Sequence, residues 1–364
     1  MIGVRSRVKI GAVFLTLALV ATACGGDDGP AVASGGCAVD GQLRETTFLL
    51  PFPFAIPFYP IFVAEGLGYY EAEGIKVNIE FADGSASVVQ QVVANNVDFG
   101  LSDPGPIVDA IALGEDLSTV FVLQNRLIYA LVTPGGSPFT TIESFVGETL
   151  GVSEATAGEV PFFEGLLAAN GVDPDSDVDI IETGAGGTTA AAFDSDRIAA
   201  YFSDYFNVIE LGFEMELTEF DLGEFGLLHG ASIVVQQSLI DDDPDLVTCL
   251  LRPIARAAEY SHAEPRAAIA AIASAFPDQV SDPEGFDKLA LDESIKRILP
   301  YEDSDDRIGW NRPDSWTAYI DLLSSRGSLG DSFDPESAYT NEFIDTINDF
   351  DKQAERDAAA AAVG

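Results

Sequence analysis

The sequence predicts an α/β protein made of two similar units, each with a mainly parallel sheet. Short apolar runs alternate with segments of helical spacing, which is typical of repeated βα units. The alternation breaks at residues 134–138 (PGGSP) and then starts again. The length of 364 residues allows one large or two ordinary domains.

The first unit is expected to begin with the strand 46–50 (TTFLL), which ends at Pro51. Helical spacing of apolar residues over 60–70 predicts a helix after it. The remaining elements of this unit are expected as strands at 77–81, 97–101, 118–123 and 128–133 and as helices at 85–95 and 106–113.

The second unit is expected to contain the helix 158–170, closed by Gly171 just beyond its end. Its other elements are expected as strands at 149–152, 178–182 and 197–202 and as short helices at 141–145 and 188–193. An apolar run at 231–236 predicts a strand that returns to the first unit, and the segments 245–275 and 314–350 are mostly helical in pattern. We therefore expect one lobe from 45–134 plus 231–364, a second from 135–230, and a ligand beyond the carboxyl ends of the strands.

The charge balance excludes some partners. The chain has 18 Lys and Arg against 60 Asp and Glu, a net charge of −42, so nucleic acid and anionic membrane surfaces are poor partners. A hydrophobic fraction of 47% argues against disorder. Two interpretations of the acidity stay open: a solvated surface that keeps the protein soluble, or a patch that collects cations.

The N-terminus has the pattern of a targeting segment. Basic residues precede the apolar run 10–23, which is too short to span a bilayer comfortably. The run ends in Ala-Thr-Ala before Cys24 and resembles the lipobox of bacterial lipoproteins, although Ala21 stands where Leu is usual. We expect residues 1–23 to be a signal peptide and 24–44 a lipidated flexible tether, which places the protein on the outer face of the cytoplasmic membrane. The alternative is an ordinary cleaved secretory signal.

Cys37 and Cys249 remain after such cleavage. Outside the cell two thiols can form a disulfide, but sequence alone does not supply the required geometry, so the pairing stays open. His229 and His262 have no Cys or second His near them in the sequence. We therefore expect no metal site and no cofactor.

Several motifs together resemble the SsuA/THI5-like, or NMT1-like, solute-binding proteins. The first is the segment 58–114, which has Pro60, Ala64, Gly68, Tyr69, Tyr70 and Gly74, then Gly84-Ser85 and Val97-Asp98-Phe99-Gly100 at the spacing of that family. Asn95 replaces a usual Gly. Segments 144–181, 196–204 and 244–260 resemble later parts of the family pattern, so the likeness covers about residues 45–275.

This resemblance implies a two-lobed type II periplasmic-binding-protein fold with a ligand cleft between the lobes. It also implies a monomer that binds a small molecule and delivers it to an ABC importer permease. Two other classes of protein are the alternatives. Some relatives are enzymes that make the thiamine pyrimidine with a His and a set of Cys, but the sequence has no GxSxG, P-loop or HExxH motif, and we expect no enzyme. A structural lipoprotein would be favoured by internal repeats, and none is evident.

Turns that follow the predicted strands are the candidate ligand contacts. Aromatic rings there can stack on a planar ligand, and helix N-termini can present N–H groups. The candidates are Phe52, Phe54, Phe58 and Tyr59; Asp83, Gly84 and Ser85; Ser102 and Asp103; Thr156, Ala157 and Gly158; and Asp204 and Tyr205. For each there is a structural alternative, which is core packing for the aromatic residues and helix capping for Ser85, Asp103 and Thr156.

Arg126 is a further candidate because cations are scarce in this chain, although pairing with a carboxylate is the usual role of Arg. If Arg126 faces the cleft, the ligand is expected to be anionic, as for sulfonate, taurine or nitrate. The aromatic turn and the acidic candidates favour instead a neutral or cationic ligand with a flat, nitrogen-bearing ring, such as the pyrimidine precursors of thiamine that this family binds.

Overall fold

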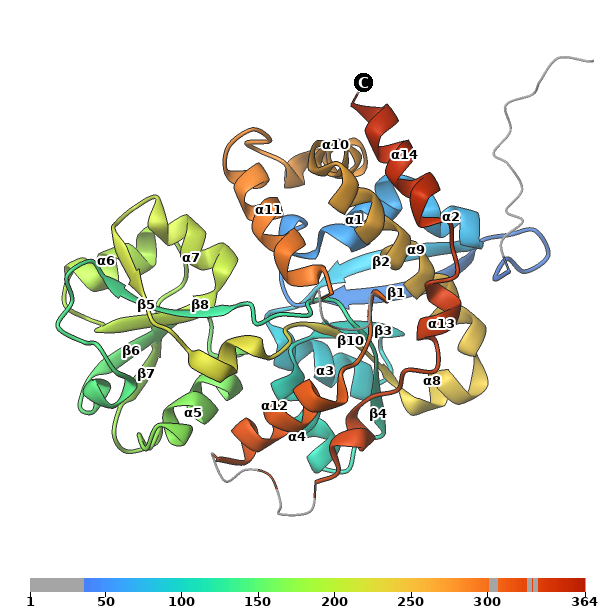
Figure 1. Cartoon of the computed structure of the whole chain (residues 1–364). Helices are drawn as coiled ribbons and strands as arrows, with labels where there is room; N and C mark the ends of the chain where they lie inside the picture. Colours follow the sequence, from blue (N-terminus) through green and yellow to red (C-terminus); the bar gives the residue numbers. More distant parts are fainter. Residues whose placement is uncertain (1–35, 301–306, 326–328, 330–332, 364) are drawn as a thin grey trace, which may run out of the picture. The chain divides into compact units, whose positions relative to one another are not determined.

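The computed structural model describes residues 36–300, 307–325, 329 and 333–363 and contains two five-stranded sheets (Figure 1). The first sheet has the order β2-β1-β3-β10-β4. Its strands are β1 (Arg44–Leu50), β2 (Ile75–Phe81), β3 (Phe99–Ser102), β4 (Leu117–Val122) and β10 (Ser232–Gln236). Strand β10 alone runs antiparallel to its neighbours, so the expected mainly parallel sheet is confirmed.

The second sheet repeats this design in the order β7-β6-β8-β5-β9. Its strands are β5 (Tyr129–Pro134), β6 (Thr149–Val152), β7 (Asp179–Glu182), β8 (Ala200–Asp204) and β9 (Leu217–Glu219). Here β5 is the antiparallel strand. We call the first sheet with its helices lobe 1 and the second sheet with its helices lobe 2. The described residues of both lobes fall in one compact unit.

The helices follow the strands in the alternating order that the sequence predicts. In chain order they are η1 (Ile56–Phe58), α1 (Tyr59–Gly66), α2 (Tyr69–Glu73), α3 (Ser85–Val93), α4 (Pro104–Ala112), η2 (Ile142–Phe145), α5 (Glu159–Ala169), α6 (Gly187–Asp194), α7 (Tyr205–Gly212), η3 (Gly223–Leu227), α8 (Gln237–Asp242), α9 (Pro244–Ala263), α10 (Pro265–Ala275), η4 (Pro277–Gln279), α11 (Phe286–Ile298), α12 (Pro313–Ser325), η5 (Pro335–Ala338), α13 (Ile344–Ile347) and α14 (Lys352–Ala362). The helix expected over 60–70 is divided between α1 and α2, because Gly68 adopts a left-handed conformation with φ +70°.

One strand lies in a different sheet from the one expected. The strand at 128–133 was placed with the first unit because it precedes PGGSP, but β5 pairs with β8 and β9 of lobe 2. The break is a turn inside lobe 2, where the Gly135 N–H donates to the Glu216 carbonyl at 2.8 Å. The chain therefore crosses between the lobes before β5 and not after it.

Two crossing segments, 123–128 and 220–231, lie side by side. The Leu123 and Gln124 N–H groups both donate to the Ala231 carbonyl oxygen, at 3.0 and 3.1 Å. The Gln124 side chain in turn accepts from the Ala231 N–H at 3.0 Å. A pair of adjacent crossing strands of this kind is the usual place for a hinge between two lobes.

The C-terminal segment also departs from the expected division. Helix α12 was expected in lobe 1 with the rest of 231–364, but Trp316 and Tyr319 share a buried cluster with Phe162 and Phe163 of α5. The Tyr319 and Phe162 rings meet edge to face at 5.8 Å. The apolar face of α12 therefore packs on lobe 2, and α12 contacts α4 of lobe 1 as well.

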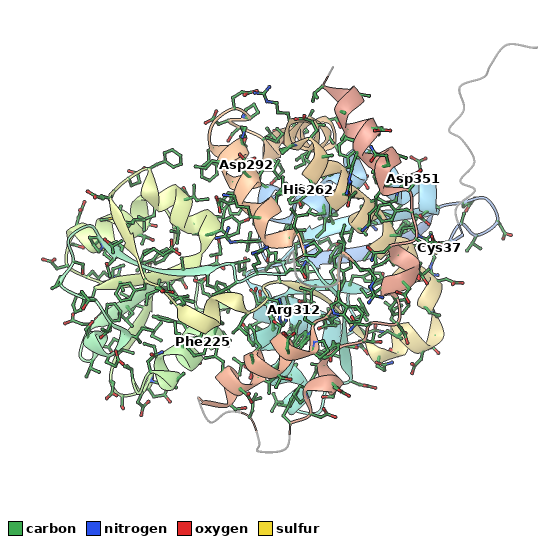
Figure 2. The ribbon with its side chains drawn as sticks, in the orientation of Figure 1. Cys37, Phe225, His262, Asp292, Arg312 and Asp351 are labelled. Atoms are coloured by element: carbon green, nitrogen blue, oxygen red, sulfur yellow. A yellow bond between two sulfur atoms is a disulfide. The ribbon has the colours of Figure 1, made fainter. Side chains whose placement is uncertain are left out.

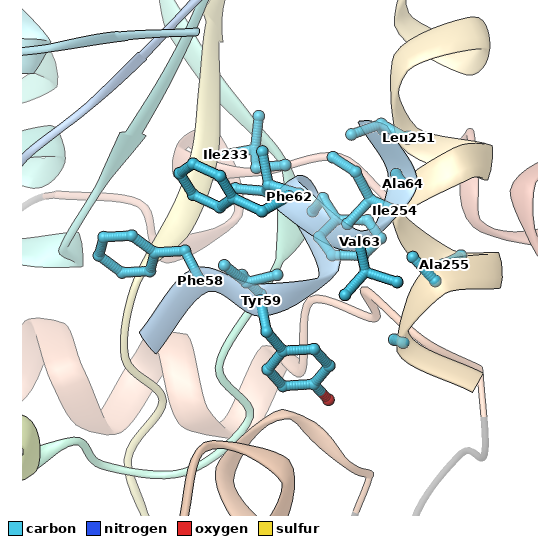
Figure 3. Packing of buried hydrophobic residues seen from close by; sticks show 14 of the residues in the cluster. Phe58, Tyr59, Phe62, Val63, Ala64, Ile233, Leu251, Ile254 and Ala255 are labelled. Carbon is cyan, nitrogen blue, oxygen red and sulfur yellow. The ribbon is translucent and has the colours of Figure 1, made fainter. Parts of the chain in front are cut away.

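The core of lobe 1 is formed where α1 packs on α9 and on the first sheet (Figure 3). Phe62 and Val63 are completely buried against Ile254, and Ile233 of β10 lies in the same cluster. Each large apolar side chain buried in this way contributes about 1.5–3 kcal/mol. This packing holds the loop before α1, which carries the aromatic candidates, on a rigid support.

Cys37, labelled in Figure 2, forms a disulfide with Cys249, which settles the open pairing. The bridge fastens the segment before β1 to helix α9. The flexible tether was expected to reach residue 44, but Cys37 is bridged and Arg44 begins β1, so 37–44 belong to the folded lobe. The expected signal peptide and the lipidation of Cys24 lie outside the described residues. Within the described part of the chain, no helix is both long enough and apolar enough to cross a membrane.

Candidate functional site

A cavity of about 240 Å³ lies between the loops of the two lobes. Its walls follow strand ends: Pro51 comes after β1, Asp103 after β3 and Ser153 after β6. The carboxyl ends of the strands in an open α/β sheet are where ligands bind, so this is the candidate site. The candidates from the sequence that line it are Phe52, Phe54, Gly84, Ser85, Asp103, Ala157, Gly158 and Asp204.

The loop after β1 forms an aromatic wall. The Phe52 and Phe54 rings lie 5.8 Å apart, and Phe54 packs on Phe206 of lobe 2 at 5.2 Å. Phe54 is 45% exposed, so part of its ring is free to cover a ligand. Phe58 and Tyr59, predicted beside them, are buried in the core of lobe 1 instead (Figure 3). They belong to η1 and α1, and neither is among the residues that line the cavity.

The carboxyl ends of the parallel strands β2 and β3 bring Ser85 and Asp103 together. The Ser85 hydroxyl donates to Asp103 Oδ2 at 2.8 Å. Ser85 is the first residue of α3 and does not cap it, since Gly84 is the N-cap residue. Ser102 is buried behind this pair, where its hydroxyl donates to carbonyl oxygens of Ser85 and Asp103. The structural role predicted as the alternative for Ser85 is therefore wrong, and Ser102 supports the cavity wall without lining it.

Lobe 2 contributes a buried carboxyl group that sequence reasoning missed. Glu159 begins α5, and its Oε1 accepts hydrogen bonds from the Ser153 N–H and hydroxyl, both at 2.7 Å. The Ser203 hydroxyl donates to Oε2 at 3.2 Å. An acidic residue in the first turn of a helix is usually explained by its favourable interaction with the helix dipole. Because that explanation was sufficient for Glu159, the sequence did not indicate its place in the site. Its position directly after a predicted strand and turn was the available signal.

Burial changes the acidity of these groups. It raises the pKa of Glu159 to about 8, with a further rise from the nearby Asp204 charge and an opposing effect of the Ser153 hydrogen bonds. Burial also raises the pKa of Asp204 to about 6, against the hydrogen bonds that its carboxylate accepts from the Asn207 and Phe206 N–H groups. Asp204 is thus both the N-cap of α7 and part of the cavity wall.

Asp83 and Thr156 connect the lobes at the edge of the cavity without lining it. The Thr156 hydroxyl donates to the Asp83 carbonyl oxygen at 2.8 Å. Gly84 lies beside this bond with φ +85°, and a Cβ atom there would come within 2.5 Å of the Thr156 carbonyl oxygen. The glycine therefore permits both the backbone conformation and the close approach of the lobes.

Substituting Gly84→Ala is expected to weaken ligand binding at least tenfold, because the added methyl group would hold Thr156 and its lobe away. Gly114→Ala is the matched control, since Gly114 has φ +97° and open space around it. Both variants should lose about 1–2 kcal/mol of stability through backbone strain. Calorimetric titration that finds equal affinities for the two variants would contradict the steric role of Gly84.

Arg126 and Tyr205 lie outside the cavity lining. The Arg126 N–H donates to the Arg297 carbonyl oxygen at 3.2 Å. The Arg297 guanidinium in turn lies 4.2 Å from the centre of the Tyr205 ring, and the Tyr205 hydroxyl bonds to Ser294. Since Arg126 is not among the residues that line the cavity, its position does not point to an anionic ligand.

The described lining is acidic and aromatic. It contains the carboxyl groups of Asp103, Glu154, Glu159 and Asp204, and no Lys, Arg or His side chain occurs among the residues that line it. No group of three or more His, Cys, Asp or Glu with the geometry of a metal site occurs in the described ranges. Such a cavity offers acceptors to N–H groups and a flat apolar surface to a ring.

Known proteins resemble this chain over most of its length. The riboflavin-binding protein RibY of Chloroflexus aurantiacus is 25% identical over 307 residues, which cover 83% of this chain and 86% of RibY. The 4-amino-5-hydroxymethyl-2-methylpyrimidine phosphate synthase of Legionella pneumophila is 25% identical over 313 residues, covering 83% and 93%.

The fold is that of periplasmic binding proteins. The alkanesulfonate-binding protein SsuA of Xanthomonas axonopodis pv. citri, solved with bound MOPS, aligns with a TM-score of 0.63 at 13% identity, over 82% of this chain and 99% of SsuA. The family model described as NMT1/THI5 like matches residues 56–268. This chain therefore belongs to the NMT1/THI5-like family.

Proposed function

We propose that the protein is the extracytoplasmic receptor of an ABC importer and captures a neutral or cationic solute with a flat, nitrogen-bearing ring. In this proposal residues 1–23 direct export, Cys24 carries the lipid anchor at the outer face of the cytoplasmic membrane, and the receptor acts as a monomer beside its permease. The family and the fold support the receptor role. The ligand class rests on the cavity.

The observation that carries the ligand class is an aromatic wall facing carboxyl groups without a compensating cation among the described lining residues. A like charge 4 Å from an anionic ligand costs roughly 4 kcal/mol at an effective dielectric constant of 20. An anionic sulfonate would meet this repulsion from Asp103 or Asp204. A neutral or cationic ring would instead find acceptors for its N–H groups and stack on Phe52 or Phe54.

The size of the cavity narrows the class further. Drug-sized ligands occupy pockets of about 300–1,000 Å³. A cavity of about 240 Å³ suits a substituted single ring such as a pyrimidine. The names of the two relatives, one a riboflavin-binding protein and one a pyrimidine phosphate synthase, concern nitrogen heterocycles and agree with this class.

Thermal-shift screening followed by calorimetric titration tests the proposal. The panel comprises 4-amino-5-hydroxymethyl-2-methylpyrimidine, thiamine and riboflavin, with taurine and nitrate as anionic comparators. A ligand at one hundred times its Kd stabilises the protein by about 2.7 kcal/mol, so at least one ring compound should raise Tm by several degrees. Stabilisation by taurine or nitrate, with none by the ring compounds, contradicts the proposed ligand class.

The same purified protein tests the enzyme alternative, which the synthase relative supports. A receptor releases its ligand unchanged. Bound ring compounds are therefore expected to be recovered intact after incubation, as measured by mass spectrometry of the released small molecules. Covalent change of the ligand over repeated turnovers would favour an enzyme on this fold.

A further inference from the structure

Two buried polar groups from opposite lobes lie together in the wall of the cavity. Asp103 follows β3 in lobe 1 and is 7% exposed, and Tyr129 begins β5 in lobe 2 and is 6% exposed. Both line the cavity. Tyr129 is not among the candidate residues that the sequence predicts.

One polar atom of each residue is buried and lacks a hydrogen-bond partner among the described residues. Asp103 Oδ2 accepts from Ser85, but Asp103 Oδ1 and the Tyr129 hydroxyl have no partner of hydrogen-bond geometry among the described residues. The Tyr129 hydroxyl is nonetheless close enough to Asp103 to affect its acidity. Burial raises the pKa of the Asp103 carboxyl group, and the nearby Ser85 and Tyr129 hydroxyls oppose that rise. Buried polar atoms without partners are rare and costly, so each calls for an explanation.

The chemistry of the pair defines what could satisfy it. A carboxylate oxygen accepts hydrogen bonds, and a phenol hydroxyl can donate one. The complementary partner is a planar group with an N–H donor next to a ring nitrogen or carbonyl acceptor. The edge of a 4-aminopyrimidine and the imide edge of a pyrimidinedione or isoalloxazine both have this arrangement. Phe52 and Phe54 then lie where they can cover the face of such a ring.

We propose that Asp103 and Tyr129 bind one edge of the ligand ring that carries an N–H donor beside an acceptor. The ligand N–H donates to Asp103 Oδ1, and the Tyr129 hydroxyl donates to the adjacent acceptor. This inference rests on the proposed function. It specifies which edge of the ligand ring the protein recognises. Since the two residues come from different lobes, a ligand bound in this way also joins lobe 1 to lobe 2. A site built around such donors and acceptors discriminates strongly against analogues that lack them.

Matched ligand pairs test the inference on the unmodified protein. The pairs are 4-aminopyrimidine with 4-methylpyrimidine, and uracil with 3-methyluracil. Each second compound has a similar ring but lacks the donor at the edge. Calorimetric titration should show at least tenfold tighter binding of the donor-bearing compound in one pair, and that pair identifies the amidine or the imide edge.

Variants assign the two roles separately. Asp103→Asn should reduce the discrimination within the responsive pair to less than threefold, since it removes the charged acceptor. Tyr129→Phe should weaken both compounds of that pair about tenfold, because both keep the ring acceptor. Tyr70→Phe is the control, since Tyr70 is also buried and its hydroxyl donates to the Ile61 carbonyl oxygen in the core. Thermal unfolding shows which variants fold, and the ligand pairs remain informative if one does not.

The outcomes separate this inference from the proposed function. If no flat-ring compound of the wider panel binds, the proposed function fails. If ring compounds bind but both pairs show equal affinities, and Asp103→Asn and Tyr129→Phe bind them normally, only the edge recognition is overturned. That result would indicate that water, and not the ligand, satisfies the two groups.

Discussion

Replacing Cys37 and Cys249 together with serine is expected to lower the free energy of unfolding by about 3–5 kcal/mol. The bridge joins residues 212 positions apart, so it restricts a large part of the unfolded chain. Both cysteines are nearly buried in the core of lobe 1, at 6% and 5% exposure, where serine hydroxyls would pack less well. Urea denaturation of the mature protein, with and without the double substitution, measures the change.

A reductant provides the control for this prediction. It should destabilise the natural protein by a similar amount and leave the double variant unchanged. Cys24→Ser in both proteins removes the third cysteine, so that no other thiol responds. Equal unfolding midpoints for the natural protein and the double variant would show that the bridge does not stabilise the fold.

Stability is expected to fall as the pH rises through the range in which Glu159 ionises. The unfolded chain releases the Glu159 proton near 4.5, whereas burial holds the folded-state pKa at about 8. The stabilisation is therefore complete below pH 4.5 and is lost as the pH rises through about 8. At 1.36 kcal/mol for each pKa unit, the loss amounts to roughly 3–5 kcal/mol. Asp204, whose pKa is raised to about 6, acts in the same direction over a lower range.

Glu159→Gln should flatten this dependence, because glutamine resembles the protonated side chain and can still accept from Ser153. Glu115→Gln is the matched control, since it removes one negative charge from an exposed position. Free energies of unfolding at pH 5, 6.5 and 8.5 should fall steeply for the natural protein and for Glu115→Gln, and less for Glu159→Gln. Parallel profiles for all three proteins would show that the general repulsion of an acidic chain, and not Glu159, causes the dependence.

Most helices and strands were predictable because their signals are local. The alternation of VNIEF and the helical spacing of the segment after Gly84 are short-range patterns that tertiary contacts reinforced. The expected helix 158–170 ends at the glycine that the pattern indicated, since Gly171 has φ +75°. The turns after strands were likewise the right places to look for the site, because strand ends of one sheet meet at one edge.

Individual side chains were harder to predict. Phe52 and Phe58 occur in one short aromatic turn, yet the first lines the cavity and the second is buried in the core. Both residues are phenylalanine, so residue type does not distinguish their roles. Only the direction of each side chain relative to α1 and the first sheet does so. Arg126 was the candidate cation near a predicted strand, and it is not among the residues that line the cavity.

The sequence by itself determined the kind of protein: repeated βα units, an acidic chain, and the motifs of a solute-binding family. The tertiary structure alone decided that β5 joins lobe 2, that Cys37 and Cys249 are bridged, and that Asp103 meets Tyr129. The physical reason is that the spacing of apolar residues along the chain indicates which face of a helix or strand is buried. That spacing is a property of residues close together in the sequence. Which strand, cysteine or carboxylate that face meets depends on packing between segments far apart in the chain, and no local pattern records that choice.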